Sequence, residues 1–153
     1  DAGTTLLALA EQLPCVPLTV ITHSLDIANY LAHREEIKLI VAGGEWDASQ
    51  RLFKGDSAVT QIQAYRADLL FMGACAVHPQ LGVTASEAGD AAIKRAMLLV
   101  SQSAILLADQ TKCNATAPHA IAPLSRFSHW HSDRAPAWLL PEPSPALIIT
   151  API

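Results

Sequence analysis

Short apolar runs recur along this chain, and the stretches between them are long enough for helices. A run of about five apolar residues bounded by turn-forming residues is typical of a parallel β-strand that helices cover on both faces. Strands that alternate with helices indicate βαβ units. The pattern therefore predicts an α/β fold, with a mostly parallel sheet and helices on both faces. The five runs are residues 18–22, 37–41, 68–72, 104–108 and 146–150.

Four segments between these runs have helical periodicity. Leu6, Leu9 and Leu13 share one stripe of the first segment, and Pro14 ends it. Ser24 is a favourable N-cap for the second. Between residues 111 and 146 six prolines interrupt every longer pattern, so only short elements are expected there, among them a strand near 129–133. The predicted helices are residues 5–13, 24–32, 57–65 and 86–102.

Composition fits one folded domain over residues 1–153. Hydrophobic residues make up 51% of the chain and charged residues 16%, which excludes a disordered chain. No apolar run approaches the roughly 20 residues that cross a bilayer. The chain has a net charge of −4 and lacks the basic stripe that is typical of a DNA-binding domain. Any DNA contact is therefore expected from another part of the protein. The first residue is Asp1 rather than Met, and we expect the chain to be a fragment of a longer protein.

The three cysteines are far apart in the sequence and odd in number. This pattern argues against a disulfide framework and favours a reducing cytoplasm. Cys75 follows a strand end, but no His–Asp arrangement nearby marks its thiol as a nucleophile. His129, His131 and Asp133 share one face of the predicted strand, but no fourth ligand lies close in sequence. No dinucleotide-binding motif, P-loop or G-x-S-x-G motif is present. Taken together, these observations predict no metal, cofactor or catalytic residue.

Ligands of open parallel sheets bind at the carboxyl ends of the strands, and four such loops here carry polar residues. The first loop leads from Asp1 through Gly3 into a helix, whose free N–H groups suit a phosphate together with the hydroxyls of Thr4 and Thr5. An ordinary helix-capping turn is the alternative. In the second loop His23 and Ser24 could donate hydrogen bonds to a ligand, or Ser24 could simply cap its helix.

The third loop contains Gly43 and Gly44, which leave room above the sheet edge, and the residues that follow to Gln50 could form a lid. In the fourth region Glu87, Asp90 and Lys94 share one face of a predicted helix. Asp109 and Lys112 follow the next strand. Carboxylates and lysines at one edge suit recognition of sugar hydroxyls, or acid–base chemistry. The alternative for the helix is a solvated face with a weak Asp90–Lys94 surface pair.

Taken in order, these segments resemble the carboxyl-terminal domain of DeoR-family transcriptional repressors. The resemblance covers residues 1 to about 134, with the segments in the family's order and spacing. The residues that carry it are Asp1-Ala-Gly-Thr-Thr5, Thr22-His23-Ser24, Val41-Ala-Gly-Gly44, residues 67–73, Gly82-Val-Thr84, Ile93-Lys94-Arg95-Ala96-Met97 and Leu107-Ala108-Asp109-Gln-Thr-Lys112.

This resemblance implies a ligand-sensing domain of a sugar-operon repressor. It implies an effector that is a phosphorylated sugar or sugar alcohol, an amino-terminal winged helix-turn-helix outside this chain that binds operator DNA, and a homo-oligomer. The implied fold is similar to ribose-5-phosphate isomerase, glucosamine-6-phosphate deaminase and coenzyme A transferases. Carried over position by position, the implied effector pocket comprises Asp1, Gly3, Thr4, Thr5, His23, Ser24, Gly43, Gly44, Glu87, Lys94, Asp109 and Lys112.

Three functions remain open from the residues alone. In the first, the domain binds its ligand without chemistry and shifts the equilibrium between states that differ in DNA affinity. In the second, the chain is an isomerase or deaminase acting on the same class of ligand, with Glu87, Asp90 or Asp109 as base. In the third, the pocket is vestigial and the domain serves subunit assembly. The family resemblance favours the first, a sensor that is not an enzyme.

Overall fold

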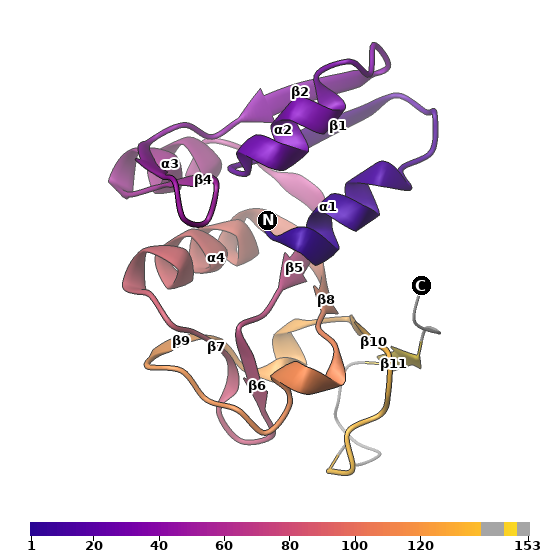
Figure 1. Ribbon diagram of the computed structural model, residues 1–153, viewed down its shortest axis with the longest axis vertical. Coiled ribbons are helices and arrows are strands. Elements are labelled where there is room, and N and C mark those ends of the chain that lie inside the picture. Colours follow the sequence, from indigo (N-terminus) through magenta and orange to yellow (C-terminus); the bar gives the residue numbers. More distant parts are fainter. Residues whose placement is uncertain (139–145, 150–153) are drawn as a thin grey trace.

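The computed structural model describes residues 1–138 and 146–149 (Figure 1). Six strands are parallel to their neighbours and form two sheets. β1 (Leu18–Thr22) pairs with β2 (Ile37–Val41). The second sheet has the order β11-β10-β8-β5. Its strands are β5 (Ala67–Gly73), β8 (Ser101–Leu107), β10 (His129–Ser132) and β11 (Ala146–Ile149).

The predicted strands are therefore confirmed, although β8 begins earlier than expected and residue 150 lies outside the described residues. The four predicted helices are also present, each somewhat shorter than expected. The Ser24 hydroxyl accepts a hydrogen bond from the Ile27 N–H at 3.3 Å and so caps the second helix. The helices are α1 (Thr4–Glu11), α2 (Leu25–Leu31), α3 (Asp56–Gln63) and α4 (Ala88–Val100).

Helices pack on both faces of the parallel strands, because alternate side chains of a strand point to opposite faces. On one face Phe71 of β5 and Leu107 of β8 pack against the apolar stripes of α1 and α2. On the other face Met72 and Leu106 are fully buried in a larger core with α3 and α4. The mixed α/β class with parallel strands and helices on both faces is thus confirmed.

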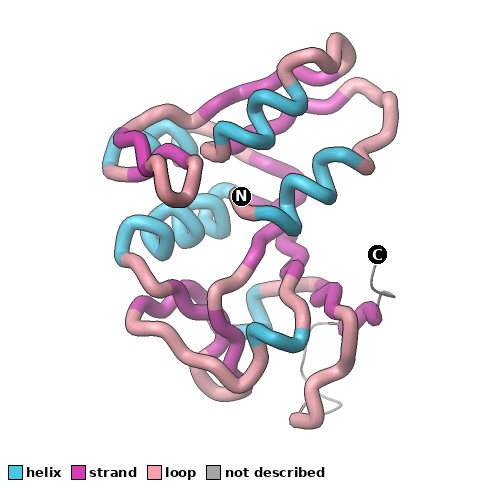
Figure 2. The backbone as a smooth tube through the Cα atoms, viewed as in Figure 1, coloured by secondary structure: helices cyan, strands magenta, loops and turns pink. Residues whose placement is uncertain are grey.

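Five short antiparallel strands were not predicted. β3 (Glu45–Asp47) and β4 (Leu52–Lys54) form a hairpin in the segment expected to be a lid. β6 (Ala76–His78), β7 (Gly82–Ala85) and β9 (His119–Ala122) form a sheet at the end of the molecule opposite β1 and β2 (Figures 1 and 2). Two 3-10 helices complete the described elements, η1 (Gln110–Lys112) and η2 (Leu124–Arg126). No described helix is both long and apolar enough to cross a membrane.

Candidate functional site

A cavity of about 330 Å³ opens where β5 and β8 end. The carboxyl ends of parallel strands are the usual ligand position in such folds. Besides the strand ends, the start of α1, the first half of α4 and η1 form its walls. Six residues that the sequence predicts for the effector pocket line this cavity: Gly3, Thr4, Thr5, Lys94, Asp109 and Lys112.

The start of α1 forms the part of the cavity best suited to an anion. Gly3 has a φ of +108°, a conformation that side-chain-bearing residues rarely adopt, and it precedes the first helical residue. No side chain caps this helix, and the first hydrogen bond of the turn is donated by the Leu7 N–H to the Gly3 carbonyl at 3.0 Å. Among the described residues the N–H groups of Thr4, Thr5 and Leu6 therefore have no hydrogen-bond partner, and they lie at the positive end of the helix dipole.

Lys112 adds a positive charge to the same cavity. It lies at the end of η1 and is partly exposed. Within the described part of the chain, its ammonium makes no ion pair. Lys112 is thus available to a ligand phosphate, whereas the other lysine of the cavity is already engaged.

That second lysine, Lys94, is only 5% exposed. Its Nζ donates a hydrogen bond to Asp1 Oδ2 at 2.6 Å and lies 3.5 Å from Asp90 Oδ1. Burial lowers the pKa of Lys94, and the nearby Asp90 charge opposes that shift. The interpretation of Asp90 and Lys94 as an exposed surface pair is therefore wrong, because Asp1, far away in sequence, completes a buried cluster.

Asp1 forms part of the support beneath the cavity. Its side chain is fully buried, and its Oδ2 also accepts a hydrogen bond from the Gly73 N–H at 2.8 Å. The Asp1 carbonyl accepts a hydrogen bond from the Thr22 hydroxyl at 3.3 Å. Asp1 therefore links the ends of β1 and β5 to Lys94 of α4.

Two carboxylates also line the cavity, those of Asp90 and Asp109. Asp109 Oδ1 accepts hydrogen bonds from the Thr111 N–H at 2.7 Å and from the Thr111 hydroxyl. The hydroxyl bond is the main reason that the pKa of Asp109 is lowered. Asp90 Oδ2 lies 3.8 Å from the Cys75 thiol, which also lines the cavity. The carboxylates can accept hydrogen bonds from ligand hydroxyls.

The turn of the β3–β4 hairpin brings Gln50 to the cavity. Its Nε2 donates a hydrogen bond to Glu87 Oε1 at 2.8 Å. Glu87 Oε2 pairs with Lys54 Nζ at 3.2 Å, and Lys54 pairs with Asp47 at 2.6 Å. Lys54 lowers the pKa of Asp47 through this contact. Glu87 does not line the cavity itself, but it fixes the hairpin that supplies Gln50.

Five other predicted residues also lie outside the cavity lining, Asp1 among them. His23 is 0% exposed, and neither ring nitrogen has a hydrogen-bond partner among the described residues. Burial, followed by the charges of the Asp1 amino group and Lys94, lowers the pKa of His23 well below its usual value. Ser24 is buried and caps α2. The structure therefore places both residues behind the strand ends.

Gly43 and Gly44 fasten the end of β2 to α3. The Gly43 N–H donates a hydrogen bond to Gln61 Oε1 at 3.2 Å, and Gln61 Nε2 donates one back to the Gly43 carbonyl at 3.1 Å. A Cβ on Gly44 would lie 2.5 Å from the Lys54 carbonyl oxygen. Gly44 therefore permits close backbone packing that fills the space expected above the sheet edge, whereas a Cβ on Gly43 would meet no atom within 4 Å. Neither glycine lines the cavity.

Sequence reasoning did not include Gln50 or Cys75 in the pocket. Gln50 was predicted only as the end of a lid segment, and the unpredicted β3–β4 hairpin brings it to the cavity. Cys75 follows β5 directly, so its position after a strand end was the available signal. Among the residues that the structure describes, no three His, Cys, Asp or Glu side chains gather in a way that could hold a metal ion.

A parallel α/β fold with a polar cavity at the carboxyl ends of its strands defines the general class of α/β ligand-binding domains. The model of the family described as the DeoR C terminal sensor domain matches residues 1–134, and the chain belongs to this family.

Curated relatives extend this assignment. The HTH-type transcriptional repressor GlcR of Bacillus subtilis is 31% identical over 136 residues, which are 89% of this chain and 52% of the relative. The putative aga operon transcriptional repressor of Escherichia coli O157:H7 is 29% identical over 83% of this chain and 48% of its own length. The L-fucose operon activator of Haemophilus influenzae is 29% identical over 88% and 54%. The chain thus spans about half the length of these relatives.

Proposed function

We propose that this chain is the effector-sensing domain of a DNA-binding transcriptional regulator of sugar metabolism, and that its cavity binds a phosphorylated sugar. The family assignment supports the sensing role. The relatives are named as transcriptional repressors or activators, two of them of sugar operons. In this proposal a winged helix-turn-helix outside the 153 residues contacts operator DNA, and the whole protein is a cytoplasmic homo-oligomer.

We infer the ligand class from one observation, that the same cavity contains groups suited to a phosphate and groups suited to sugar hydroxyls. The free N–H groups at the start of α1 and the ammonium of Lys112 suit a phosphate. Asp90, Asp109 and Gln50 suit several hydroxyls. A volume of about 330 Å³ lies at the small end of the range for ligand sites, in keeping with a sugar phosphate.

The proposed contacts of the ligand are therefore narrower than the set implied by the family resemblance. Direct contact is proposed for Gly3, Thr4, Thr5, Asp109 and Lys112, with Asp90 and Gln50 in addition. Lys94 and Asp1 form the charged floor. The remaining members of the predicted set are proposed to position these groups from behind: His23, Ser24, Gly43, Gly44 and Glu87.

We propose binding without chemistry. A general base is most effective when its pKa is close to the working pH. The pKa of Asp109 is instead lowered, away from neutral pH, because the Thr111 hydroxyl stabilises the charged carboxylate. The proposal includes a fold similar to those of ribose-5-phosphate isomerase, glucosamine-6-phosphate deaminase and coenzyme A transferases. It does not include the reactions of these enzymes.

Calorimetry with the 153-residue chain tests the ligand class. The titrants are ribose, fructose, tagatose, glucitol and glucosamine phosphates, each paired with its unphosphorylated form, together with inorganic phosphate. We expect at least one phosphorylated sugar to bind and its unphosphorylated form to bind much more weakly. A product assay on each binding ligand accompanies the titration, and turnover at an enzyme-like rate would assign the chain to the isomerase or deaminase class instead.

Lys112→Met then tests the anion site. Loss of a charge-assisted hydrogen bond is worth about 1.5–3 kcal/mol, so the affinity for the bound sugar phosphate should fall at least tenfold. Lys38→Met is the matched control, because Lys38 lies exposed on β2 outside the cavity. Equal affinities for both variants would remove Lys112 from the site, and an absence of binding throughout the panel would count against the proposal as a whole.

A further inference from the structure

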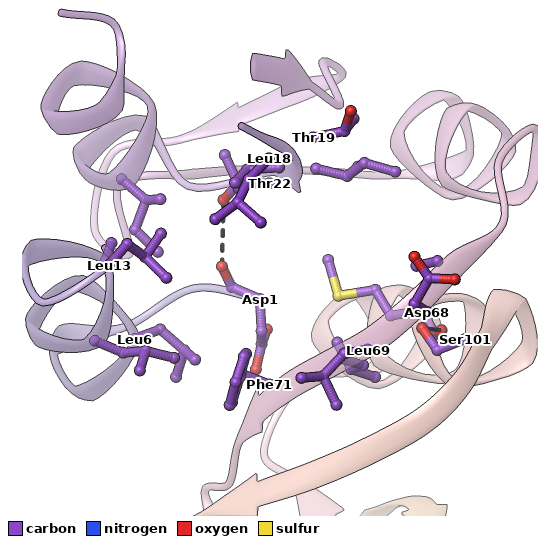
Figure 3. A pocket seen from close by; sticks show the side chains of 18 of the residues that line it. Asp1, Leu6, Leu13, Leu18, Thr19, Thr22, Asp68, Leu69, Phe71 and Ser101 are labelled. Carbon is purple, nitrogen blue, oxygen red and sulfur yellow. Dashed lines mark hydrogen bonds between the residues drawn. The ribbon is translucent and has the colours of Figure 1, made fainter. Parts of the chain in front are cut away.

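One face of the second parallel sheet is covered by helices only in part. The register of this sheet aligns Phe71 of β5, Ile105 of β8 and His129 of β10 in one row. At one end of the row Phe71 packs against the core of α1 and α2 and lines a groove of about 530 Å³ (Figure 3). At the other end, the described elements that contact β10 extensively are its neighbouring strands β8 and β11. His129 therefore lies on a part of this face that no described helix covers.

A second histidine, His131, lies on the same face of β10. Successive side chains of a strand point to opposite faces, so His129 and His131 point one way, and Trp130 and Ser132 point the other way. Burial follows this alternation, because Trp130 and Ser132 are buried whereas both histidines are partly exposed. The Cα atoms of residues two apart in a strand are separated by roughly 6–7 Å. Two accessible imidazoles thus lie side by side.

A neighbouring hydroxyl orients the ring of His129. Ser128 Oγ donates a hydrogen bond to the Ala104 carbonyl at 3.1 Å, and it lies 3.1 Å from His129 Nδ1. Because a serine hydroxyl has only one proton, its oxygen is left to accept a hydrogen bond from the Nδ1–H group of His129. A neutral imidazole that carries its proton on Nδ1 has a free lone pair on Nε2. Hydrogen bonds of this kind commonly orient metal-binding histidines.

Asp133 does not complete a site of three ligands, although it follows the two histidines at the same spacing. β10 ends at Ser132, and Asp133 Oδ1 accepts a hydrogen bond from the Gln110 N–H of η1 at 2.8 Å. Among the described residues, the cluster therefore consists of two imidazoles alone. Neither imidazole lines the cavity proposed for the sugar phosphate, so the two sites are separate.

We propose that His129 and His131 together chelate one transition-metal dication of the kind that imidazole prefers, such as Zn²⁺, Ni²⁺ or Cu²⁺. Both rings project from one face of one strand, so their free nitrogens can approach a single ion at the usual distance of about 2.0–2.1 Å. The sequence predicts no metal here because no fourth ligand lies nearby, but a chelate of two imidazoles needs none when water completes the coordination. Mg²⁺ and Ca²⁺ prefer oxygen ligands and should not bind.

An apolar partner fits this face less well than a metal ion. The residues of β8 that lie in register with the two histidines are Ile105 and Leu107, whose side chains offer no hydrogen bond to an imidazole. A partner that covered the face with apolar side chains would bury the free nitrogen of His129 without a hydrogen bond, which costs about 1–3 kcal/mol. A metal ion instead uses the same lone pair.

Calorimetric titration with Ni²⁺ tests the proposal on the 153-residue chain without an affinity tag. The variants are His129→Gln and His131→Gln, because glutamine keeps a polar side chain but lacks the imidazole ligand. Ser128→Ala removes the hydroxyl that orients His129. His33→Gln is the matched control, since His33 is exposed between α2 and β2. Titration of the parent with Mg²⁺ checks the preference for nitrogen ligands.

We expect the parent and His33→Gln to bind Ni²⁺ with the same affinity, and each of the variants His129→Gln and His131→Gln to bind at least tenfold more weakly. Ser128→Ala should weaken binding by about tenfold, as loss of a group that orients a ligand usually does. One ion per chain supports the proposal. One ion per two chains, with a dimer in sedimentation, also supports it and assigns the remaining ligands to the histidines of a second copy.

Three results would overturn the proposal. The first is a parent that does not bind Ni²⁺. The second is an affinity that survives both histidine substitutions, which would assign the ion to other groups such as the exposed thiols of Cys15 and Cys75. The third is a loss of affinity in only one of the two histidine variants, because a chelate requires both imidazoles.

Electron paramagnetic resonance of bound Cu²⁺ gives an independent measurement. The parent should show coordination by two imidazole nitrogens, and either histidine variant should show at most one. Two nitrogens in both variants would contradict the proposal. Neither measurement involves a sugar phosphate, so failure here is distinguishable from failure of the proposed effector.

Discussion

Replacing Lys94 by Met should destabilise the protein strongly, because it removes the cation from a buried pair while keeping most of the aliphatic stem. The Asp1 side chain is 0% exposed, its Oδ1 has no partner among the described residues, and its Oδ2 would keep only the Gly73 N–H. Leaving one member of a buried ion pair uncompensated costs about 3–5 kcal/mol. For a chain of 153 residues this corresponds to a fall in Tm of about 6–20 °C.

Urea unfolding followed by tryptophan fluorescence measures this difference, with Lys38→Met as the control. The control should remain within about 0.5 kcal/mol of the parent, since Lys38 is exposed. The double variant Asp1→Asn with Lys94→Met removes both charges and should be more stable than Lys94→Met alone. The reasoning is refuted if Lys94→Met unfolds at the parent's urea concentration, or if the double variant shows simple additivity.

Three further changes test the packing around the strands. His23 has a lowered pKa in the folded state, so below about pH 6.5 the unfolded chain binds a proton that the folded chain does not. As the pH is lowered, the free energy of unfolding should therefore decrease more steeply for the parent than for His23→Phe, by up to about 1.4 kcal/mol per pH unit. Urea titrations between pH 5 and 8 measure this difference, and equal slopes for the two proteins would contradict it. Gly82→Ala should destabilise by about 1–3 kcal/mol, because Gly82 has a φ of +70° and a Cβ there would lie 2.2 Å from the Ala122 carbonyl oxygen; a Tm equal to the parent's would contradict this. Trp130→Phe removes the hydrogen bond that Nε1 donates to the Ala108 carbonyl at 2.9 Å, in a fully buried position, and should cost about 1–3 kcal/mol in the same assay.

The parallel strands and the four helices could be predicted because each carries its own local signal. β1 and β2 are short runs of mostly apolar residues, and Ser24 caps the helix that follows β1. The antiparallel strands lack such a signal. β3 is only Glu45–Asp47, and a three-residue strand with two acidic residues has neither the length nor the alternation that identifies a strand.

The position of the site was predictable, but the partners of its charges were not. The rule that ligands bind at strand carboxyl ends led to Gly3, Asp109 and Lys112, which the structure brings to one cavity. The spacing of Asp90 and Lys94 indicated a pair but gave no information on burial. The partner that decides the environment of Lys94 is Asp1, and a contact between residues so far apart in sequence leaves no periodic pattern.

Asp1 belongs to the charged cluster and also joins the ends of the two parallel sheets. Its carbonyl is bonded to Thr22 of β1, and its carboxylate is bonded to Gly73 of β5 and to Lys94. The ends of β1 and β5 are therefore held at a fixed separation by side-chain and main-chain bonds to one residue. Because Asp1 also leads through Gly3 into α1, the same bonds fix the free N–H groups of that helix over the cavity. Loss of the Lys94 contact should thus disturb the ends of β1 and β5 and the anion site together, whereas loss of Lys112 should affect only the anion site.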